Sequence, residues 1–349
     1  MSLRPAFPAL AAALLFGAST PLAKLLVGQV QPLLLAGLLY MGSGVGLGLL
    51  LGVRRALRGP RAVPASIPAR ELPWLLGAIV CGGVLGPALL MWGLTRTDAA
   101  SASLLLNVEG VLTALIAWLV FREHTSARIV LGMLAIVGGG ALLSWPRHAA
   151  MPSIGALLIV GACLAWALDN NLTRKVSSND AMLIACVKGL LAGACNTALA
   201  LAGGAALPAP PALLGGLLVG FVGYGLSLSL FVVALRTLGT ARSGAYFSVA
   251  PLFGVVIALA LWPALPSATF CAAAVLMAVG VWLHVSERHA HAHTHASLQH
   301  SHAHRHDAHH RHAHDFAWDG REPHVHAHRH DALTHTHAHT PDIHHRHAH

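Results

Sequence analysis

The chain has 349 residues, of which 55% are hydrophobic and 10% are charged, and its formal net charge is +9. This composition excludes a separate soluble domain in any stretch before residue 289. The net charge by itself suggests a nucleic-acid partner, so the positions of the cations decide what the charge means.

Ten apolar stretches follow one another from Ala6 to Val285. A bilayer core of about 30 Å needs about 20 helical residues per crossing, so stretches of this length predict membrane spans. We therefore expect an all-α integral membrane protein with ten transmembrane helices and short loops. The predicted spans are residues 6–27, 32–53, 72–94, 99–121, 126–145, 153–173, 181–203, 213–236, 241–262 and 267–285.

Basic residues gather in alternate loops. If the N-terminus is cytoplasmic, 13 Lys and Arg residues up to Arg288 lie on the cytoplasmic side, whereas the other side holds Arg96 and Arg147, with Lys24 near a span end. This bias is the positive-inside rule. It predicts a multi-pass protein of a cell membrane, a bacterial inner membrane in our interpretation, with both termini cytoplasmic. The topology then accounts for the positive net charge, and no nucleic-acid partner is needed to explain it.

The two halves of the membrane part echo each other. Residues 14–26 align with 164–176, and residues 93–110 align with 234–251. Because five is an odd number, a second copy of a five-span unit enters the membrane upside down, as in secondary transporters whose site lies near the midplane. The predicted parts are a first repeat at 1–148, a second repeat at 149–288 and a His-rich cytoplasmic tail at 289–349.

The same segments resemble the EamA family of the drug/metabolite transporter superfamily over residues 6–288. The resemblance rests on LLFGASTPLAKLL, TDAASASLLLNVEG, FREHTSARIVLGMLAIVGGGALL, LAWALDNNLTRKV and ALRTLGTARSGAYFSVAPLFG. It implies ten helices, inverted repeats and a central cavity lined mainly by spans three, four, eight and nine. Two positions depart from the family pattern: Gly110 replaces the Pro of span four, and Glu123 has no counterpart after span nine.

Polar residues inside apolar spans are candidate site residues, because each ionisable group in lipid is costly unless it meets a cavity or a partner. Glu109 lies near the middle of span four, and helical spacing puts Ser103, Asn107 and Gly110 on a neighbouring face. A carboxyl group there can bind a cation or a proton. The alternative is a neutral Glu109 that only holds two helices together.

A second candidate is an ion pair between Asp169 in span six and Lys188 in span seven, with Asn170 and Asn171 beside it. The pair is either a structural link or a gate that opens during transport. The remaining candidates belong to spans that the resemblance assigns to the cavity, and ordinary packing is the alternative for each of them. They are Trp92, Tyr224, Ser227 and Tyr246.

The tail changes composition abruptly, since 23 of the 61 residues from His289 to His349 are His. Its low apolar content predicts disorder. Neutral imidazoles suit Ni, Co, Zn and Cu, so we expect the tail to bind such a divalent metal, although the protein requires no cofactor. The candidate ligands are His289, His291, His293, His295, His302, His304, His306, His309, His310, His312, His314, His326, His328, His330, His335, His337 and His339.

Three functions fit these features. The first is a secondary transporter that moves a small metabolite or drug by alternating access, with export as the expected direction. The second is a transition-metal efflux carrier fed by the tail, and the third is a membrane-tethered metal store or sensor. We expect no enzyme, since no nucleophile constellation, phosphate loop or catalytic zinc signature is present. The metabolite carrier is favoured, because the spans contain no HxxxH, no paired carboxylates along one helix and no CxxC spacing. The substrate, the coupling ion and the oligomeric state stay open.

The charge distribution predicts that a membrane-impermeant thiol reagent will label single cysteines in the 54–71 loop and after Arg288 only in permeabilised cells. The background is a variant without the five native cysteines. A cysteine in the 28–31 loop is the control and should react in intact cells. Labelling of the 54–71 loop in intact cells would contradict this topology.

Overall fold

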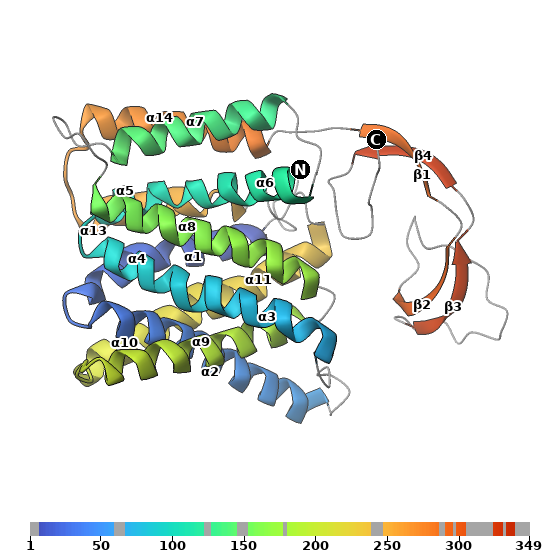
Figure 1. The fold of residues 1–349 in the computed structure, drawn as a ribbon, viewed down its shortest axis with the longest axis horizontal. Helices are drawn as coiled ribbons and strands as arrows, with labels where there is room; N and C mark the ends of the chain where they lie inside the picture. The colour runs from blue at the N-terminus through green and yellow to red at the C-terminus, as the bar shows by residue number, and fades with distance from the viewer. Residues whose placement is uncertain are drawn as a thin grey trace. The chain divides into compact units, whose positions relative to one another are not determined.

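The computed structural model describes residues 7–58, 67–121, 127–144, 153–176, 180–238, 247–285, 290–295, 298–304, 324–330 and 333–338. Two compact units are distinguished, a helical unit within Met1–Glu287 and a tail unit, Arg288–Pro341. The helical unit is a bundle of roughly aligned helices (Figure 1).

The first half of the helical unit contains five apolar segments, and two of them are interrupted. Their elements are α1 (Phe7–Val27), α2 (Pro32–Arg58), a short 3₁₀ turn η2 (Ala69–Glu71), α3 (Leu72–Ala78), the π-helical η3 (Ile79–Leu85), α4 (Gly86–Leu94), α5 (Ala99–Leu105), α6 (Asn107–Phe121) and α7 (Ala127–Ser144). Span four breaks between α5 and α6, where the Asn107 side-chain amide donates to the carbonyl oxygen of Leu104 at 2.8 Å. Such a local bond competes with regular helix geometry.

The second half has the same kind of elements. They are α8 (Ile154–Thr173), a 3₁₀ turn η4 (Arg174–Val176), α9 (Ala181–Ala202), α10 (Pro210–Gly220), the π-helical η5 (Phe221–Leu226), α11 (Ser227–Leu238), α13 (Ala250–Leu261) and α14 (Ala268–Val285). Of the predicted span 241–262, only the part from residue 247 lies among the described residues.

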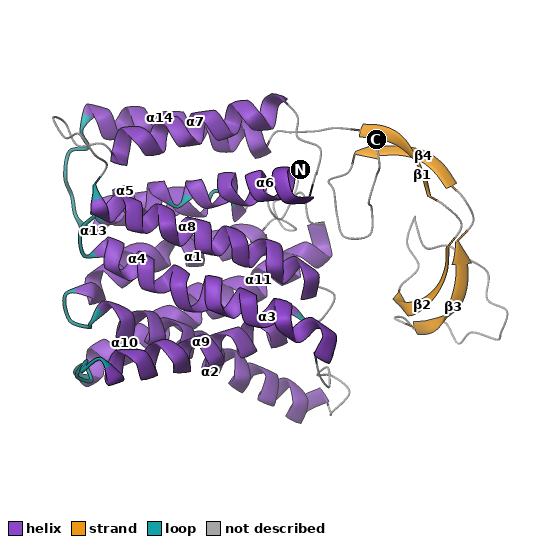
Figure 2. Cartoon of the chain, in the orientation of Figure 1, coloured by secondary structure: helices purple, strands orange, loops and turns teal. Residues whose placement is uncertain are grey.

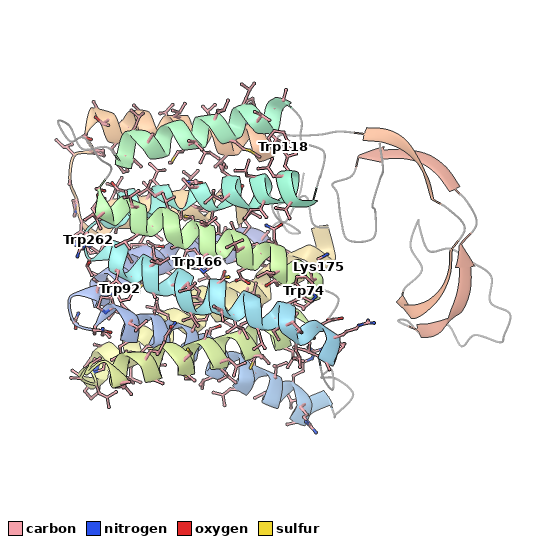
Figure 3. All side chains as sticks on the ribbon, in the orientation of Figure 1. Trp74, Trp92, Trp118, Trp166, Lys175 and Trp262 are labelled. Atoms are coloured by element: carbon pink, nitrogen blue, oxygen red, sulfur yellow. The ribbon has the colours of Figure 1, made fainter. Side chains whose placement is uncertain are left out.

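Seven helical segments are long and apolar enough to cross a membrane, and three shorter apolar helices cover Ala127–Leu143, Ala250–Leu261 and Ala268–Leu283 in the described part of the chain. The described loops gather at one end of the helices (Figure 2). Trp92 and Trp262 lie toward that end, Trp74 and Trp118 toward the other, and Trp166 lies between them (Figure 3). This distribution is typical of membrane helices, whose ends favour Trp.

Close backbone contacts hold the helices together. Helix α2 packs against both α9 and α10. A side chain at Gly42 would collide with the carbonyl of Leu217, and one at Gly220 would collide with the carbonyl of Leu39. Small residues at such points let helix backbones approach in lipid, where burial of apolar surface gives little drive for association.

The described residues of the tail form two pairs of antiparallel strands. Strand β1 (Ala290–His295) pairs antiparallel with β4 (Leu333–Ala338), and β2 (Leu298–His304) pairs antiparallel with β3 (His324–His330). The physical basis is the alternation of His with Ala, Thr or Ser, which matches the two-residue period of a strand.

The packing predicts different effects for one substitution at two positions of α2. Gly42→Ala should lower the free energy of unfolding by roughly 1–3 kcal/mol, because the added methyl group has no room. Gly52→Ala is the matched control, since nothing lies within 4 Å of its added Cβ. Thermal unfolding of both purified variants measures the difference. Equal melting temperatures would contradict the close α2–α10 contact.

Candidate functional site

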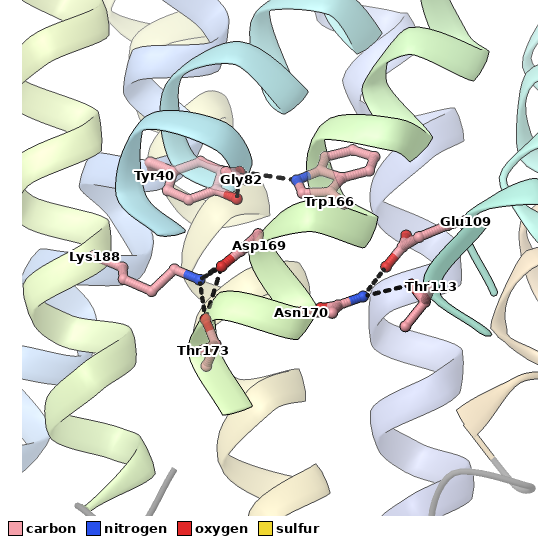
Figure 4. A network of polar contacts seen from close by, with 9 residues as sticks. All are labelled: Tyr40, Gly82, Glu109, Thr113, Trp166, Asp169, Asn170, Thr173 and Lys188. Atoms are coloured by element: carbon pink, nitrogen blue, oxygen red, sulfur yellow. Dashed lines mark hydrogen bonds and ion pairs between the residues drawn. The ribbon is translucent and has the colours of Figure 1, made fainter. Parts of the chain in front are cut away.

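Helix α8 carries an ion pair on one face. The Lys188 Nζ of α9 donates to the Asp169 carboxylate, at 2.5 Å from Oδ1 and 2.7 Å from Oδ2. One turn further along α8, the Thr173 hydroxyl donates to Asp169 Oδ1 at 2.7 Å (Figure 4). The structure therefore joins the two charged residues that the sequence paired. Both side chains are largely buried, so the bilayer interior meets a neutral pair instead of two ions.

The π-helical segment η3 supplies acceptors beside this pair. The Tyr40 hydroxyl and the Trp166 Nε1 both donate to the carbonyl oxygen of Gly82, at 2.7 Å and 2.9 Å (Figure 4). The Asn196 amide donates to the carbonyl of Gly83 at 3.0 Å. A π-helix breaks the regular ladder of backbone bonds and is frequent at functional sites. Here three other helices, α2, α8 and α9, supply the donors.

Gly82 also determines how closely η3 approaches α8. A side chain at this position would overlap the carboxylate of Asp169. The glycine therefore makes room for the ion pair, and the same residue accepts two hydrogen bonds through its carbonyl. The ion pair and the π-helical segment form one structural unit.

Glu109 lies on the other side of α8, where its surroundings are neutral. The Asn170 amide donates to Glu109 Oε1 at 2.9 Å and to the Thr113 hydroxyl at 3.3 Å (Figure 4). Glu109 is half-buried and Asn170 is exposed. No cation pairs with Glu109 among the side chains that the structure describes. Of two consecutive residues of α8, Asp169 carries a carboxylate that Lys188 neutralises, and Asn170 binds the Glu109 carboxyl group, which has no cation partner among the described side chains.

Among the other predicted site residues, Asn171 reaches this network through Thr113, whereas Ser103, Asn107 and Ser227 do not join it. Ser103 is buried and its hydroxyl has no hydrogen-bond partner within the described part of the chain. Asn107, the first residue of α6, donates to the carbonyl of Leu104 in α5. Asn171 is buried and donates to the carbonyls of Ala167 at 2.8 Å and of Thr113 at 3.4 Å. The Ser227 hydroxyl donates to the carbonyl of Ala12 at 2.9 Å, so it links α11 to α1.

Three further predicted site residues are aromatic. Trp92 lies near the end of α4 and keeps 41% of its surface exposed, which fits an interfacial position. Tyr246 lies outside the described residues. Tyr224 is in η5, half-buried, and its ring lies 5.5 Å from that of Tyr40 between centroids.

Sequence reasoning missed several members of the network. Trp166 and Thr173 stand three residues before and four residues after Asp169, a spacing that shares one helix face, so this signal was available. Tyr40, Gly82 and Asn196 gave no local signal. Their roles follow from contacts across the bundle.

A metal site is not part of this centre. The described residues contain no group of three or more His, Cys, Asp or Glu side chains that could hold a metal ion. The chemistry that the centre offers is therefore that of a carboxyl group, amides, hydroxyls and aromatic rings.

Comparison with known proteins adds the following. Residues 4–145 and residues 153–286 each match the EamA-like transporter family. A protein of Methanothermobacter thermautotrophicus described as an uncharacterized transporter is 28% identical over 265 residues, which cover 71% of this chain and 76% of that protein. A solved crystal structure aligns with a TM-score of 0.59 at 18% identity, over 79% of this chain and 94% of that one, and shows a shared fold.

The ion pair predicts rescue by charge exchange. Asp169→Lys and Lys188→Asp should each lose folded protein, since an unpaired buried charge costs roughly 3–5 kcal/mol. The double variant should recover much of the yield and thermal stability. Arg70→Ala is a control, because the Arg70 side chain is 86% exposed and should contribute little. A double variant no better than either single one would show that the pair is not a simple charge interaction.

Proposed function

The chain belongs to the EamA-like transporter family, and from this we propose that it is a secondary transporter that moves a small metabolite or drug across the cell membrane by alternating access. The observation that carries the proposal is the polar centre on α8. This name covers Trp166, Asp169, Asn170 and Thr173 of α8 with their partners Tyr40, Gly82, Glu109, Thr113 and Lys188. Glu109 reaches Asn170 from α6, while Lys188 reaches Asp169 from α9. Burying such groups within a bilayer costs free energy, and in membrane proteins they usually mark a substrate or ion pathway.

The proposed mechanism needs two halves that move relative to each other, and we interpret the halves as inverted repeats. Each half matches the family separately. Each also has a π-helical segment at the equivalent place, η3 in span three and η5 in span eight. Equivalent helices of the two halves pack together, α2 with α9 and α7 with α14. This arrangement is what a pseudo-two-fold axis in the membrane plane would produce.

Within this mechanism Glu109 is the substrate-binding or proton-binding group, and the Asp169–Lys188 pair is a gate. The two functions are linked through α8, since Asn170 follows Asp169 directly in the chain. A rotation of α8 that opens the ion pair would also carry Asn170 away from Glu109. We propose export as the direction, and a test must follow transport both ways.

Glu109→Gln is expected to insert and fold normally but to abolish transport or uncouple it from a proton gradient. The amide keeps the size and a hydrogen-bonding oxygen, and it removes the charge. The measurement is uptake and efflux by reconstituted protein over amino acids, nucleobases, drugs and metals. Asp98→Asn is the control, because Asp98 caps α5 by accepting from the backbone N–H of Ser101 at 2.8 Å, and Asn caps equally well. Full activity of Glu109→Gln with an unchanged pH profile would assign Glu109 a structural role.

We propose in addition that the tail binds a divalent transition metal. Its strand register supports this, because His residues stand opposite His residues. In the first ribbon His291 is opposite His337 and His293 is opposite His335. Positions two apart on a strand share a face, so these four residues occupy one face of the ribbon. The second ribbon has three such pairs: His300 with His328, His302 with His326, and His304 with His324. Imidazole nitrogens are suitable ligands for Ni, Co, Zn and Cu.

The same observation supports the second candidate function, a transition-metal efflux carrier that the tail supplies. Truncation after Arg288 should remove most metal binding and leave the melting temperature of the helical unit nearly unchanged, since the tail forms a separate unit. A full-length variant with the same tail composition but without the His alternation is the matched control for charge and length. For an efflux carrier, truncation should also raise the sensitivity of cells to one metal. Unchanged metal tolerance with intact metabolite transport would rule that function out.

A further inference from the structure

Five aromatic residues from different parts of the chain form a continuous aromatic run. The centroid distances are 5.5 Å from Tyr40 to Tyr224, 5.8 Å from Tyr224 to Phe16, 5.4 Å from Phe16 to Phe247 and 4.7 Å from Phe247 to Phe231. The run thus connects α2, η5, α1 and α11. Within the run, Tyr40 is buried and the other four residues are half-buried.

The aromatic run begins at the polar centre. Tyr40 donates its hydroxyl to the Gly82 carbonyl, the same oxygen that Trp166 of α8 binds. On α8, Trp166 stands one turn before Asn170, which donates to the Glu109 carboxyl, so the links to the aromatic run and to Glu109 share one face of this helix. A carboxyl group and a set of aromatic faces are therefore within reach of one small molecule.

The charge balance decides which small molecule this is. Asp169 is neutralised by Lys188, so that pair leaves no net charge. Glu109 receives a hydrogen bond from the Asn170 amide, which carries no charge. An anionic substrate would meet repulsion from Glu109, with which no cation pairs among the described side chains. A cation would meet the carboxylate and the electron-rich faces of the rings, which attract a cation most strongly where water is excluded.

We propose that the transported substrate is an organic cation, an amine or quaternary ammonium group on an apolar or aromatic body. The charged group binds at Glu109 and the apolar body lies against the aromatic run at Tyr224 and Phe16. This inference rests on the proposed transport function and specifies its substrate class. Neither element suffices alone, since aromatic rings without a carboxyl group would accept neutral hydrophobic solutes equally well.

The test uses the purified full-length protein and three probes. They share one phenylethyl body and differ in the head group: 2-phenylethylamine and the neutral 2-phenylethanol match in size, and the N,N,N-trimethyl derivative of the amine is larger by three methyl groups. Calorimetry measures their affinities. Both cations should bind at least about 10-fold more tightly than the alcohol, which corresponds to about 1.4 kcal/mol. The permanently charged derivative separates recognition of charge from exchange of a proton.

Variants test whether Glu109 and the aromatic run each contribute to the preference for cations over the neutral alcohol. Glu109→Gln should lower the affinity for both cations about 10-fold or more and leave the alcohol unchanged, which also shows that the variant is folded. Tyr224→Leu should weaken the cations, whereas Tyr224→Phe should retain them because the ring remains. Asp98→Asn and Trp262→Leu are controls outside the site, and neither should change any affinity.

Several results would overturn the proposal. Equal affinities for the alcohol and the cations would do so, and so would a Glu109→Gln variant that keeps the preference for charge. Transport of a neutral or anionic solute by reconstituted protein that neither cation binds or inhibits would reject the substrate class and leave the transport function standing. If the cations bind as expected but reconstituted protein transports no solute, then the transport function fails and the cation site remains.

Discussion

Polar groups inside a bilayer must be hydrogen-bonded or ion-paired within the protein, because lipid offers them no partners. Helix α8 makes several such contacts in the described part of the chain. Asp169 meets Lys188, Asn170 meets Glu109, and Trp166 meets the Gly82 carbonyl. These three contacts point to α9, α6 and η3, so a single helix links three others through hydrogen bonds and charge. Unpaired, each of these groups would cost several kcal/mol in lipid.

The π-helical segments explain how a membrane helix supplies backbone acceptors without exposing them to lipid. In η3 the carbonyls of Gly82 and Gly83 accept side-chain donors from α2, α8 and α9. Irregular backbone is tolerated at membrane depth only where protein or a water-filled cavity surrounds it. The donors therefore hold η3 in its irregular form, and the absence of a side chain at Gly82 allows α8 to lie against it.

Glycine contacts and polar contacts lie in different parts of the bundle. Gly42 and Gly220 hold α2 against α10 through backbone contact, a form of packing with few polar atoms and no titratable group. The polar centre lies instead around α8, where bonds to side chains can exchange partners. A rigid contact and an exchangeable one in the same bundle are what two halves need if they are to rock without separating.

The sequence alone determined the membrane class, the helical character of the chain before Arg288, the composition break at Arg288 and the choice of Glu109, Asp169 and Lys188 as candidates, because length, hydropathy and the cost of charge in lipid are local properties. It also paired Asp169 with Lys188 correctly, since a short loop joins their spans. Only the tertiary structure decided that Ser103 and Asn107 lie apart from the Glu109 contacts, that Tyr40 and Gly82 belong to the polar centre, and that the aromatic run exists. Those facts depend on helix rotation and on contacts between residues distant in the chain, which no local pattern records. In the tail, the alternation of His with other residues is visible in the sequence. Which His residues stand opposite each other depends on the register of the paired strands, which only the tertiary structure gives.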